Sequence, residues 1–210
     1  MPIRIRNLGR TDYEPVWRDM QSFTDARGAD TPDEIWFTEH QPVFTLGVNA
    51  NRAHLLAPGD IPVVQIDRGG QVTYHGPGQV LLYPLLDLRR AGIGVRQLVT
   101  ALEQSAVALA KDFGIAAASR CDAPGVYADG VKFASVGLRI RRGASFHGMA
   151  LNVAMDLEPF SRINPCGFSD LAVTDLVSLG AGTDMDDARE RLAAHFLAQL
   201  GLDAATDSAA

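Results

Sequence analysis

The chain has 210 residues, 47% of them apolar and 21% charged, which predicts one compact domain or at most two small ones. A net charge of −6 and a pI of about 5.3 argue against a nucleic-acid or anionic-membrane surface, because such surfaces need clustered positive charge. No apolar run approaches the roughly 18 residues of a membrane-spanning helix. Since the first residues also lack the apolar stretch of a secretory signal, we expect a cytoplasmic protein with no membrane or nucleic-acid partner.

The first predicted element is a helix that begins near Thr11. Thr11 and Glu14 have the spacing of a capping box. Apolar residues then recur at helical intervals, at Tyr13, Val16, Trp17, Met20 and Phe23. Four β-rich segments follow this helix: EIWFTEH from Glu34, PVFTLG from Pro42, IPVVQI from Ile61 and QVLLYPLLDL from Gln79.

A second helix is predicted from about Val95 to Phe113, with Gly114 as its stop. The segment VYADGVKF then places the dipeptide Asp129-Gly130 between β-prone flanks, which is a strong hairpin signal. The segment SFHGMALNVAM supplies a further strand from Ser145 to Met155, and a third helix follows from about Asp184 to Leu200. Its acidic first turn, DMDD, suits the positive end of the helix dipole.

This order of elements predicts the fold class. Strands cluster in the middle of the chain and helices lie at its ends and between the strands, which is typical of an α+β (α/β) fold with a mixed β-sheet covered by helices. No repeat, low-complexity tract or linker divides the chain, so we expect residues 1–210 to form a single domain. The polar tail, residues 203–210, is expected to fray.

The stretch from Arg68 to Tyr83, RGGQVTYHGPGQVLLY, holds four glycines, an arginine and a histidine directly after a predicted strand. Such a loop can present backbone N–H groups to a phosphate or an oxyanion. Its spacing matches neither the dinucleotide fingerprint nor the P-loop. Taken alone, it is either a binding loop or a turn-rich connector, and His75 alone is more typical of a structural histidine.

Two later segments carry unusual residues. In GVKFASVGL, Lys132 interrupts an apolar strand, and from this stretch alone the simpler interpretation is that its ammonium extends to solvent at a strand edge. In FHGMALNV, Gly148 permits a close approach and Ala150 leaves room beside it. A basic segment, LRIRR, holds Arg139, Arg141 and Arg142, which with Arg89 and Arg90 form either a basic face or a solvated strand end and turn.

Cys166 lies in NPCG, where it could be a core side chain, half of a disulfide or a nucleophile. A chain with two cysteines and no export signal favours reduced thiols. Pro165 and Gly167 make an exposed thiol on a rigid turn possible. A thiol has a pKa of about 8.5, so a nucleophilic role needs a nearby cation that lowers this pKa. Neither a Cys-x-x-Cys pair nor a metal-ligand spacing of histidines occurs, so no metal is predicted.

Several segments together resemble the lipoyl(octanoyl) transferase family of lipoate biosynthesis. The segment RGGQVTYHGPGQVLLYPLLDL resembles the family's signature. The resemblance covers roughly residues 7 to 180 and includes LGRTDYEPVWRDM, EHQPVFTLGVNANRAHLL, GVYADGVKFASVGLRI, FHGMALNV and NPCGFSDLAVTDL in the expected order. It implies the catalytic fold shared with biotin protein ligases and lipoate ligases.

The resemblance also implies roles for individual residues. Cys166 matches the acyl-thioester nucleophile, and Lys132 matches the partner that lowers its pKa. Three segments match the family's substrate-binding positions: Arg68, Gly69, Gly70, Gln71, Val72, Thr73, Tyr74 and His75; Ser135, Val136 and Gly137; and Gly148, Met149 and Ala150.

The implied reaction moves octanoate from acyl carrier protein, through a cysteine thioester, to a lysine ε-amine. The implied acceptors are lipoyl domains of 2-oxoacid dehydrogenase E2 subunits and the glycine-cleavage H protein. The donor carries phosphopantetheine, and the enzyme is expected to need no ATP or other cofactor. Because carrier proteins are acidic, the arginine cluster is a candidate docking surface for the donor.

Two departures and two alternatives accompany this interpretation. Phe133 stands where the family commonly has a small residue, which would put a ring beside the Cys166 and Lys132 pair, and the stretch after NPCG, FSDLAVTDL, varies from the family's commonest form. Cys121 has no family role and is interpreted as structural. One alternative is an ATP-dependent lipoate or biotin ligase, which uses the same fold. The other is a non-catalytic acyl-binding module, against which the presence of both reactive residues argues.

Overall fold

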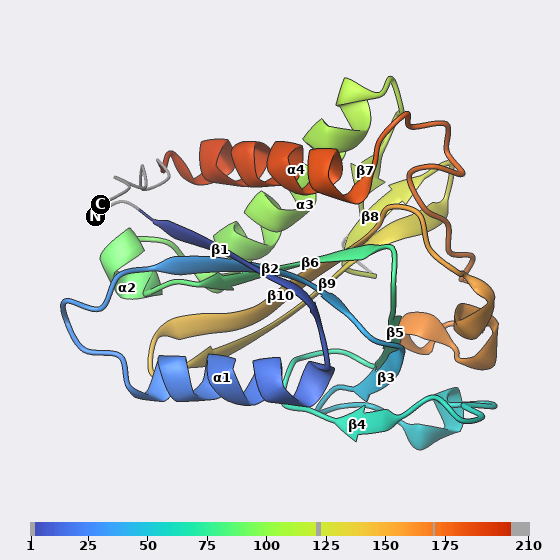
Figure 1. Cartoon of the computed structure of the whole chain (residues 1–210), viewed down its shortest axis with the longest axis horizontal. Coiled ribbons are helices and arrows are strands. Elements are labelled where there is room, and N and C mark those ends of the chain that lie inside the picture. Colours follow the sequence, from blue (N-terminus) through green and yellow to red (C-terminus); the bar gives the residue numbers. More distant parts are fainter. Residues whose placement is uncertain (1–2, 121–122, 170, 203–210) are drawn as a thin grey trace.

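A seven-stranded mixed sheet forms the centre of the computed structural model, which describes residues 3–120, 123–169 and 171–202 (Figure 1). The strands lie in the order β1 (Arg4–Thr11), β2 (Glu34–His40), β6 (Gln79–Leu85), β10 (Ala144–Asn152), β9 (Val131–Arg141), β8 (Gly125–Ala128) and β7 (Ala118–Ser119). Strands β1 and β2 pair in parallel, and the other neighbours pair antiparallel. The sheet is therefore mixed, as predicted.

A second, three-stranded sheet has the order β4 (Val63–Gln65), β3 (Val43–Leu46) and β5 (Val72–His75). Its apolar side chains Phe44, Leu46, Val72 and Tyr74 pack against Phe160 and Ile163. Phe160 belongs to the 3₁₀ helix η2 (Glu158–Arg162), and a further 3₁₀ turn, η3 (Pro165–Gly167), follows it. The short helices η1 (Arg52–His54) and α2 (Leu88–Ala91) connect other strands.

Helices cover both faces of the large sheet. Figure 1 shows α3 (Val95–Asp112) and α4 (Met185–Leu200) on one side, and α1 (Tyr13–Asp25) with the second sheet on the other. Alternate side chains of β6 enter different cores, because Val80 and Leu82 pack with α3 and α4 whereas Leu81 and Tyr83 pack with α1. The side of the large sheet that faces α1 and the second sheet is called the α1 face below.

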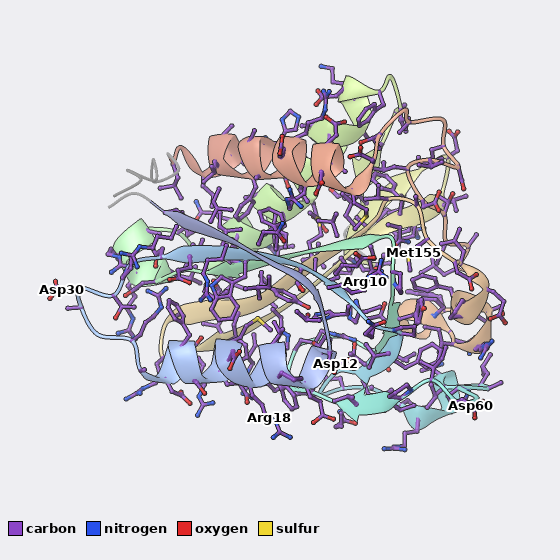
Figure 2. All side chains as sticks on the ribbon, in the orientation of Figure 1. Arg10, Asp12, Arg18, Asp30, Asp60 and Met155 are labelled. Atoms are coloured by element: carbon purple, nitrogen blue, oxygen red, sulfur yellow. The ribbon has the colours of Figure 1, made fainter. Side chains whose placement is uncertain are left out.

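The structure confirms the three predicted long helices but not the predicted capping box. The N-cap of α1 is Asp12, which makes no side-chain cap bond and lies at the junction of β1 and α1 (Figure 2). Thr11 instead ends β1, where its hydroxyl lies 2.8 Å from Thr38 Oγ1 and 3.1 Å from His40 Nδ1. The prediction was wrong because β1, an exposed edge strand, continues to Thr11 and engages its hydroxyl.

The predicted hairpin is confirmed. Asp129 and Gly130 connect β8 to β9 with φ angles of 49° and 81°, and both are left-handed, as a two-residue hairpin turn requires. The segments starting at Glu34, Pro42, Ile61, Gln79 and Ser145 all contain strands. Strand β5 was not predicted, because its four residues lie inside the glycine-rich stretch.

No helix in the described parts of the chain combines the length and the apolar character needed to span a membrane. The polar tail, residues 203–210, lies outside the described residues.

Candidate active site

A β-bulge in β9 determines where Lys132 points. The pairing of β8 with β9 sets Val126 opposite Ala134 but Tyr127 opposite Lys132, so Phe133 is an extra residue in its strand. Phe133 and Ala134 both belong to the core under α3, whereas Lys132 and Ser135 line a pocket on the α1 face. Without the bulge, strict alternation would place Lys132 on the same face as Ala134.

Lys132 is buried, with an exposed fraction of 2%. Its Nζ donates a hydrogen bond of 2.8 Å to the Pro124 carbonyl oxygen and lies 5.4 Å from the centre of the Tyr127 ring. The simpler interpretation of Lys132, an ammonium that extends to solvent, is therefore wrong. Burying an amine with specific partners at a pocket is typical of a functional group rather than a surface lysine.

Gly125 makes room for the Lys132 side chain. A Cβ atom at position 125 would lie 2.5 Å from Lys132 Cε and 3.0 Å from Nζ. Gly125 also has a φ of 138°, a conformation that other residues rarely adopt. Sequence reasoning missed Gly125, whose signal was its place at the start of GVYADGVKF.

The pocket that holds Lys132 lies between the two sheets and encloses about 530 Å³, part of it open to solvent. Predicted substrate-binding residues line most of it: Arg68, Gly70, Gln71, Val72, Thr73, His75, Ser135, Val136, Gly137, Gly148, Met149 and Ala150. The other lining residues are Tyr13, Leu81, Tyr83, Lys132 and His147.

Two predicted binding residues lie outside the pocket lining. Gly69 donates its N–H to the Leu138 carbonyl oxygen at 3.0 Å, which joins the glycine-rich loop to β9. Tyr74 points into the core of the second sheet, where its ring packs against Phe44 and Phe160. Both residues therefore hold the glycine-rich loop against its neighbouring strands and do not face the pocket.

Arg68 holds the glycine-rich loop in place. Its guanidinium donates to the Thr45 carbonyl oxygen at 2.9 Å, to Thr45 Oγ1 at 3.0 Å and to the Gly69 carbonyl oxygen at 2.8 Å. These bonds connect the loop to β3, and they keep a buried cation at the pocket wall. Gly137 leaves space for this side chain, since a Cβ atom there would lie 3.1 Å from Arg68 Cδ.

His75 is a buried neutral imidazole. Its Nδ1 lies 2.7 Å from Gln79 Oε1 and its Nε2 lies 3.3 Å from Thr45 Oγ1, while its ring stacks on Tyr13 at 5.5 Å. Burial is the main cause that lowers the pKa of His75 well below its usual value. His75 thus shapes the pocket as an uncharged wall.

His147 also lines the pocket, although the predicted binding segment begins only at the next residue, Gly148. Its φ of 57° is left-handed and unusual for a residue other than glycine. Phe146 packs in the core with α1, so strict alternation would turn His147 to the opposite face, but His147 instead contacts Tyr13 of α1. Its Nε2 lies 2.9 Å from Asp67 Oδ1, and its Nδ1 lies 3.3 Å from the Tyr13 hydroxyl.

Asp67 connects His147 to helix α1 through hydrogen bonds. It accepts hydrogen bonds from Trp17 Nε1 at 2.8 Å and Gln21 Nε2 at 3.2 Å in addition to the contact with His147. Burial opposes its ionisation, but the bonds from His147, Trp17 and Gln21 outweigh burial and hold the pKa of Asp67 below its usual value. Burial also disfavours the charged form of His147 and lowers its pKa, while Asp67 acts in the opposite direction.

The turn that carries Cys166 lies beside the pocket. The backbone of η3 contacts β5, and a Cβ atom on Gly167 would lie 3.4 Å from His54 Nε2 and 3.5 Å from Gln71 Cγ. Gln71 is itself a pocket residue. The Cys166 side chain and the whole of Cys121 lie outside the described parts of the structure, so the pairing of Cys166 with Lys132 stays a prediction.

The chain after η3 runs along Lys132. The Lys132 N–H donates to the Ala172 carbonyl oxygen at 2.9 Å, and the Thr174 N–H donates to the Lys132 carbonyl oxygen at 2.8 Å. The segment that contains Cys166 is therefore joined to the Lys132 backbone six residues later along the chain. These bonds place the chain that follows η3 beside the backbone of Lys132.

Phe133 does not lie beside the predicted reactive pair. The bulge turns its ring into the core under α3, where it is fully buried. The bulkier ring at this position therefore fills the core, and the pocket lining does not include it.

The predicted arginine cluster gathers around the turn from β9 to β10. Arg141 forms an ion pair of 3.0 Å with Asp25, and Arg142 Nη1 donates to the Asp25 carbonyl oxygen at 3.2 Å. Arg89 lies next to Gly143 in the same turn, whereas Arg90 pairs with Asp33 at 2.7 Å. Some arginines of the cluster thus pair with acidic residues, but Arg89, Arg139, Arg141 and Arg142 are all exposed.

Among the residues described, no group of three or more His, Cys, Asp or Glu side chains is arranged to hold a metal ion.

Comparison with known proteins identifies the chain's relatives. The family model for the lipoyl protein ligase A/B catalytic domain matches residues 12–197. An octanoyltransferase of Alkalilimnicola ehrlichii is 58% identical over 195 residues, which cover 93% of this chain and 91% of the relative. An octanoyltransferase of Shewanella amazonensis is 56% identical over 199 residues, which cover 95% of this chain and 92% of the relative. The chain belongs to the octanoyltransferase family. The prediction that it is an acyltransferase of this family is confirmed.

Solved structures confirm the fold that membership of the octanoyltransferase family implies. A lipoate-protein ligase A crystallised with ATP superposes with a TM-score of 0.81 at 15% identity, over 100% of this chain and 90% of that chain. A biotin protein ligase from Aquifex aeolicus gives a TM-score of 0.57 at 14% identity, over 96% and 70% of the two chains. At these identities the likeness concerns the fold alone.

Proposed function

We propose that this enzyme moves an octanoyl group from acyl carrier protein to the ε-amine of a lysine on a lipoyl domain, through a thioester on Cys166. The observation that carries the proposal is the buried amine of Lys132 in a pocket otherwise lined mainly by small and apolar groups. Such a pocket suits an acyl chain, and a buried amine suits proton transfer next to it.

In the first half-reaction the Cys166 thiolate attacks the carbonyl carbon of the octanoyl thioester on the carrier's phosphopantetheine arm. A new C–S bond forms, and the C–S bond to the carrier breaks. The Lys132 ammonium favours the thiolate before attack and then gives its proton to the departing thiol. Exchange of one thioester for another is nearly neutral in free energy, so the step needs no ATP.

In the second half-reaction the acceptor's neutral lysine amine attacks the octanoyl thioester. A C–N bond forms, the C–S bond to Cys166 breaks, and the now neutral Lys132 amine takes the proton that the attacking nitrogen loses. The Cys166 thiolate and the Lys132 ammonium are thereby restored. Backbone N–H groups of the glycine-rich loop are suited to hold the oxyanion of both tetrahedral intermediates.

The proposed partners follow from this chemistry. The donor is octanoyl acyl carrier protein, and the acceptors are lipoyl domains of 2-oxoacid dehydrogenase E2 subunits and the glycine-cleavage H protein. Both exist where fatty acids are made and lipoate-dependent enzymes assemble, which agrees with a cytoplasmic location. Apart from the donor's phosphopantetheine, the cycle uses no cofactor.

An ATP-dependent ligase is the second candidate, since a lipoate-protein ligase bound with ATP shares the fold. Transfer assays distinguish the two functions. We expect octanoyl carrier protein to modify an apo lipoyl domain without ATP, and free octanoate with ATP to leave it unmodified. Modification only from octanoate and ATP would support the ligase and contradict the proposal.

A further inference from the structure

Glu103 is a buried acidic residue that the proposed cycle does not use. It lies on α3, on the side that packs against the large sheet, with an exposed fraction of 8%. Its Oε1 accepts a hydrogen bond of 2.9 Å from the Gly125 N–H. Burial raises the pKa of Glu103, while the bond from Gly125 and the charge of Lys132 act against burial. A carboxylate held in a core needs such compensation.

A short chain of contacts joins Glu103 to Lys132. Glu103 holds the N–H of Gly125, whose missing side chain makes room for Lys132 Cε and Nζ. The preceding residue, Pro124, supplies the carbonyl oxygen that accepts from Lys132 Nζ at 2.8 Å. Moving Glu103 would therefore move the backbone that supports the ammonium.

Other groups also act on this ammonium. The centre of the Tyr127 ring lies 5.4 Å from Lys132 Nζ and 5.1 Å from Arg120 Cζ. Cys166 of η3 is the further titratable group that the proposed cycle places beside this ammonium. In addition to these groups, Glu103 supplies a negative charge near the ammonium, and this charge takes no part in the proposed reaction.

We propose that Glu103 is a positioning residue, which holds the segment around Pro124 and Gly125 under Lys132 and balances the charge of its ammonium. This inference rests on the proposed Cys166 and Lys132 pair. It assigns the buried carboxylate of α3 to the active site, although Glu103 is not among the residues that line the pocket.

The charge of Glu103 has an effect with a defined sign. Glu103→Gln keeps an oxygen that can accept from Gly125 but removes the negative charge. The Lys132 ammonium then acts on the Cys166 thiolate with less compensation, so the thiol pKa should fall by roughly 0.5 to 1 unit. Loss of a hydrogen bond or of packing alone has no reason to lower this pKa.

The test measures the rate of iodoacetamide alkylation of Cys166 against pH in a Cys121→Ser background. Three variants are compared with that parent: E103Q, Lys132→Met, and Glu190→Gln as a control at an exposed acid of α4. We expect E103Q to lower the thiol pKa, Lys132→Met to raise it, and the control to leave it unchanged. Thermal unfolding of each variant checks that it is folded.

The outcomes separate the two proposals. If Lys132→Met raises the thiol pKa but E103Q leaves it unchanged, the role of Glu103 is overturned and the reactive pair stands. If Lys132→Met has no effect, the pair fails and Glu103 loses its role with it. Should E103Q not fold, Glu103→Asp serves instead: its shorter side chain withdraws the carboxylate from the Gly125 N–H and from Lys132, so a lowered thiol pKa supports the role of Glu103 and a thiol pKa equal to the parent contradicts it.

Discussion

Individual side chains of the site show how burial sets their charge. His40, His75 and His147 are all buried around Tyr13, and burial lowers the pKa of each, for His40 to about 4. The two of these imidazoles that line the pocket, His75 and His147, therefore add no charge to its wall near neutral pH. The cations that remain in the lining are Arg68 and Lys132.

The buried imidazoles predict that stability falls with acidification. His40 has a folded-state pKa of about 4 and an ordinary value of 6.5, so the unfolded chain binds more protons between these limits. Stability is therefore full above about pH 6.5 and is lost as the pH falls towards 4, by at most about 1.4 kcal/mol per pH unit from His40. Urea unfolding at about pH 7 and about pH 5 measures the slope.

Two variants make this pH test specific. His40→Gln removes the titrating ring and should flatten the slope, whatever it does to stability at neutral pH. Tyr83→Phe is the matched control. It removes the hydroxyl that lies 2.9 Å from His40 Nε2 but leaves the titrating His40 ring in place. A slope that His40→Gln and Tyr83→Phe change equally would contradict the assignment.

At this scale the sequence predicts which segments line the pocket better than it predicts how each side chain is buried. The segments around Arg68, Ser135 and Gly148 do line a pocket, which their resemblance implied. Lys132 looked like a lysine that reaches solvent, because its burial depends on Gly125, on a bulge and on a carbonyl of a separate turn. Glu103 and Asp67 carried no signal, because their partners lie 22 and 80 residues away.

At the scale of elements, strand β9 links several parts of the site. Its first residues hold Lys132 and the bulge, its middle lines the pocket with Ser135 and Gly137, and its end carries the arginines. Periodicity alone predicts strict alternation along such a strand. The bulge breaks this alternation, and no local pattern in GVKFASVGL marks the extra residue.

The arginine-rich turn after β9 predicts a salt-sensitive step. If the exposed cations steer an acidic carrier, the double variant Arg139→Glu and Arg142→Glu should lower kcat/KM for octanoyl carrier protein by roughly tenfold at low ionic strength. It should also weaken the dependence of kcat/KM on salt. Steady-state transfer assays over a range of salt concentrations measure both effects.

A control variant tests whether the place of the charge matters. Arg4→Glu with Arg18→Glu makes the same change in net charge on β1 and α1, where both side chains are exposed and Arg18 points away from the sheet (Figure 2). This control should leave the salt dependence close to that of the parent. If the β9 variant does the same, the turn is only a solvated strand end.

At the scale of the whole molecule, the pocket exists because the two sheets face each other. The glycine-rich loop and β5 form one wall, and β6, β9 and β10 form the other, while α1 contributes Tyr13. The long helices and most strands were predictable from period and turn residues. The second sheet was not, because β5 was missed and no local pattern determines that β3 pairs with β4 and β5 apart from the large sheet.

The central claim is that the enzyme carries the octanoyl group on Cys166 between its two partners. The intact mass of the protein tests it most directly, measured after incubation with octanoyl carrier protein and again after an apo lipoyl domain is added. We expect a gain of one octanoyl group and then its loss, and no gain in the Cys166→Ala variant. Transfer to the lipoyl domain without any acyl-enzyme, or an adduct that survives Cys166→Ala, would contradict the account.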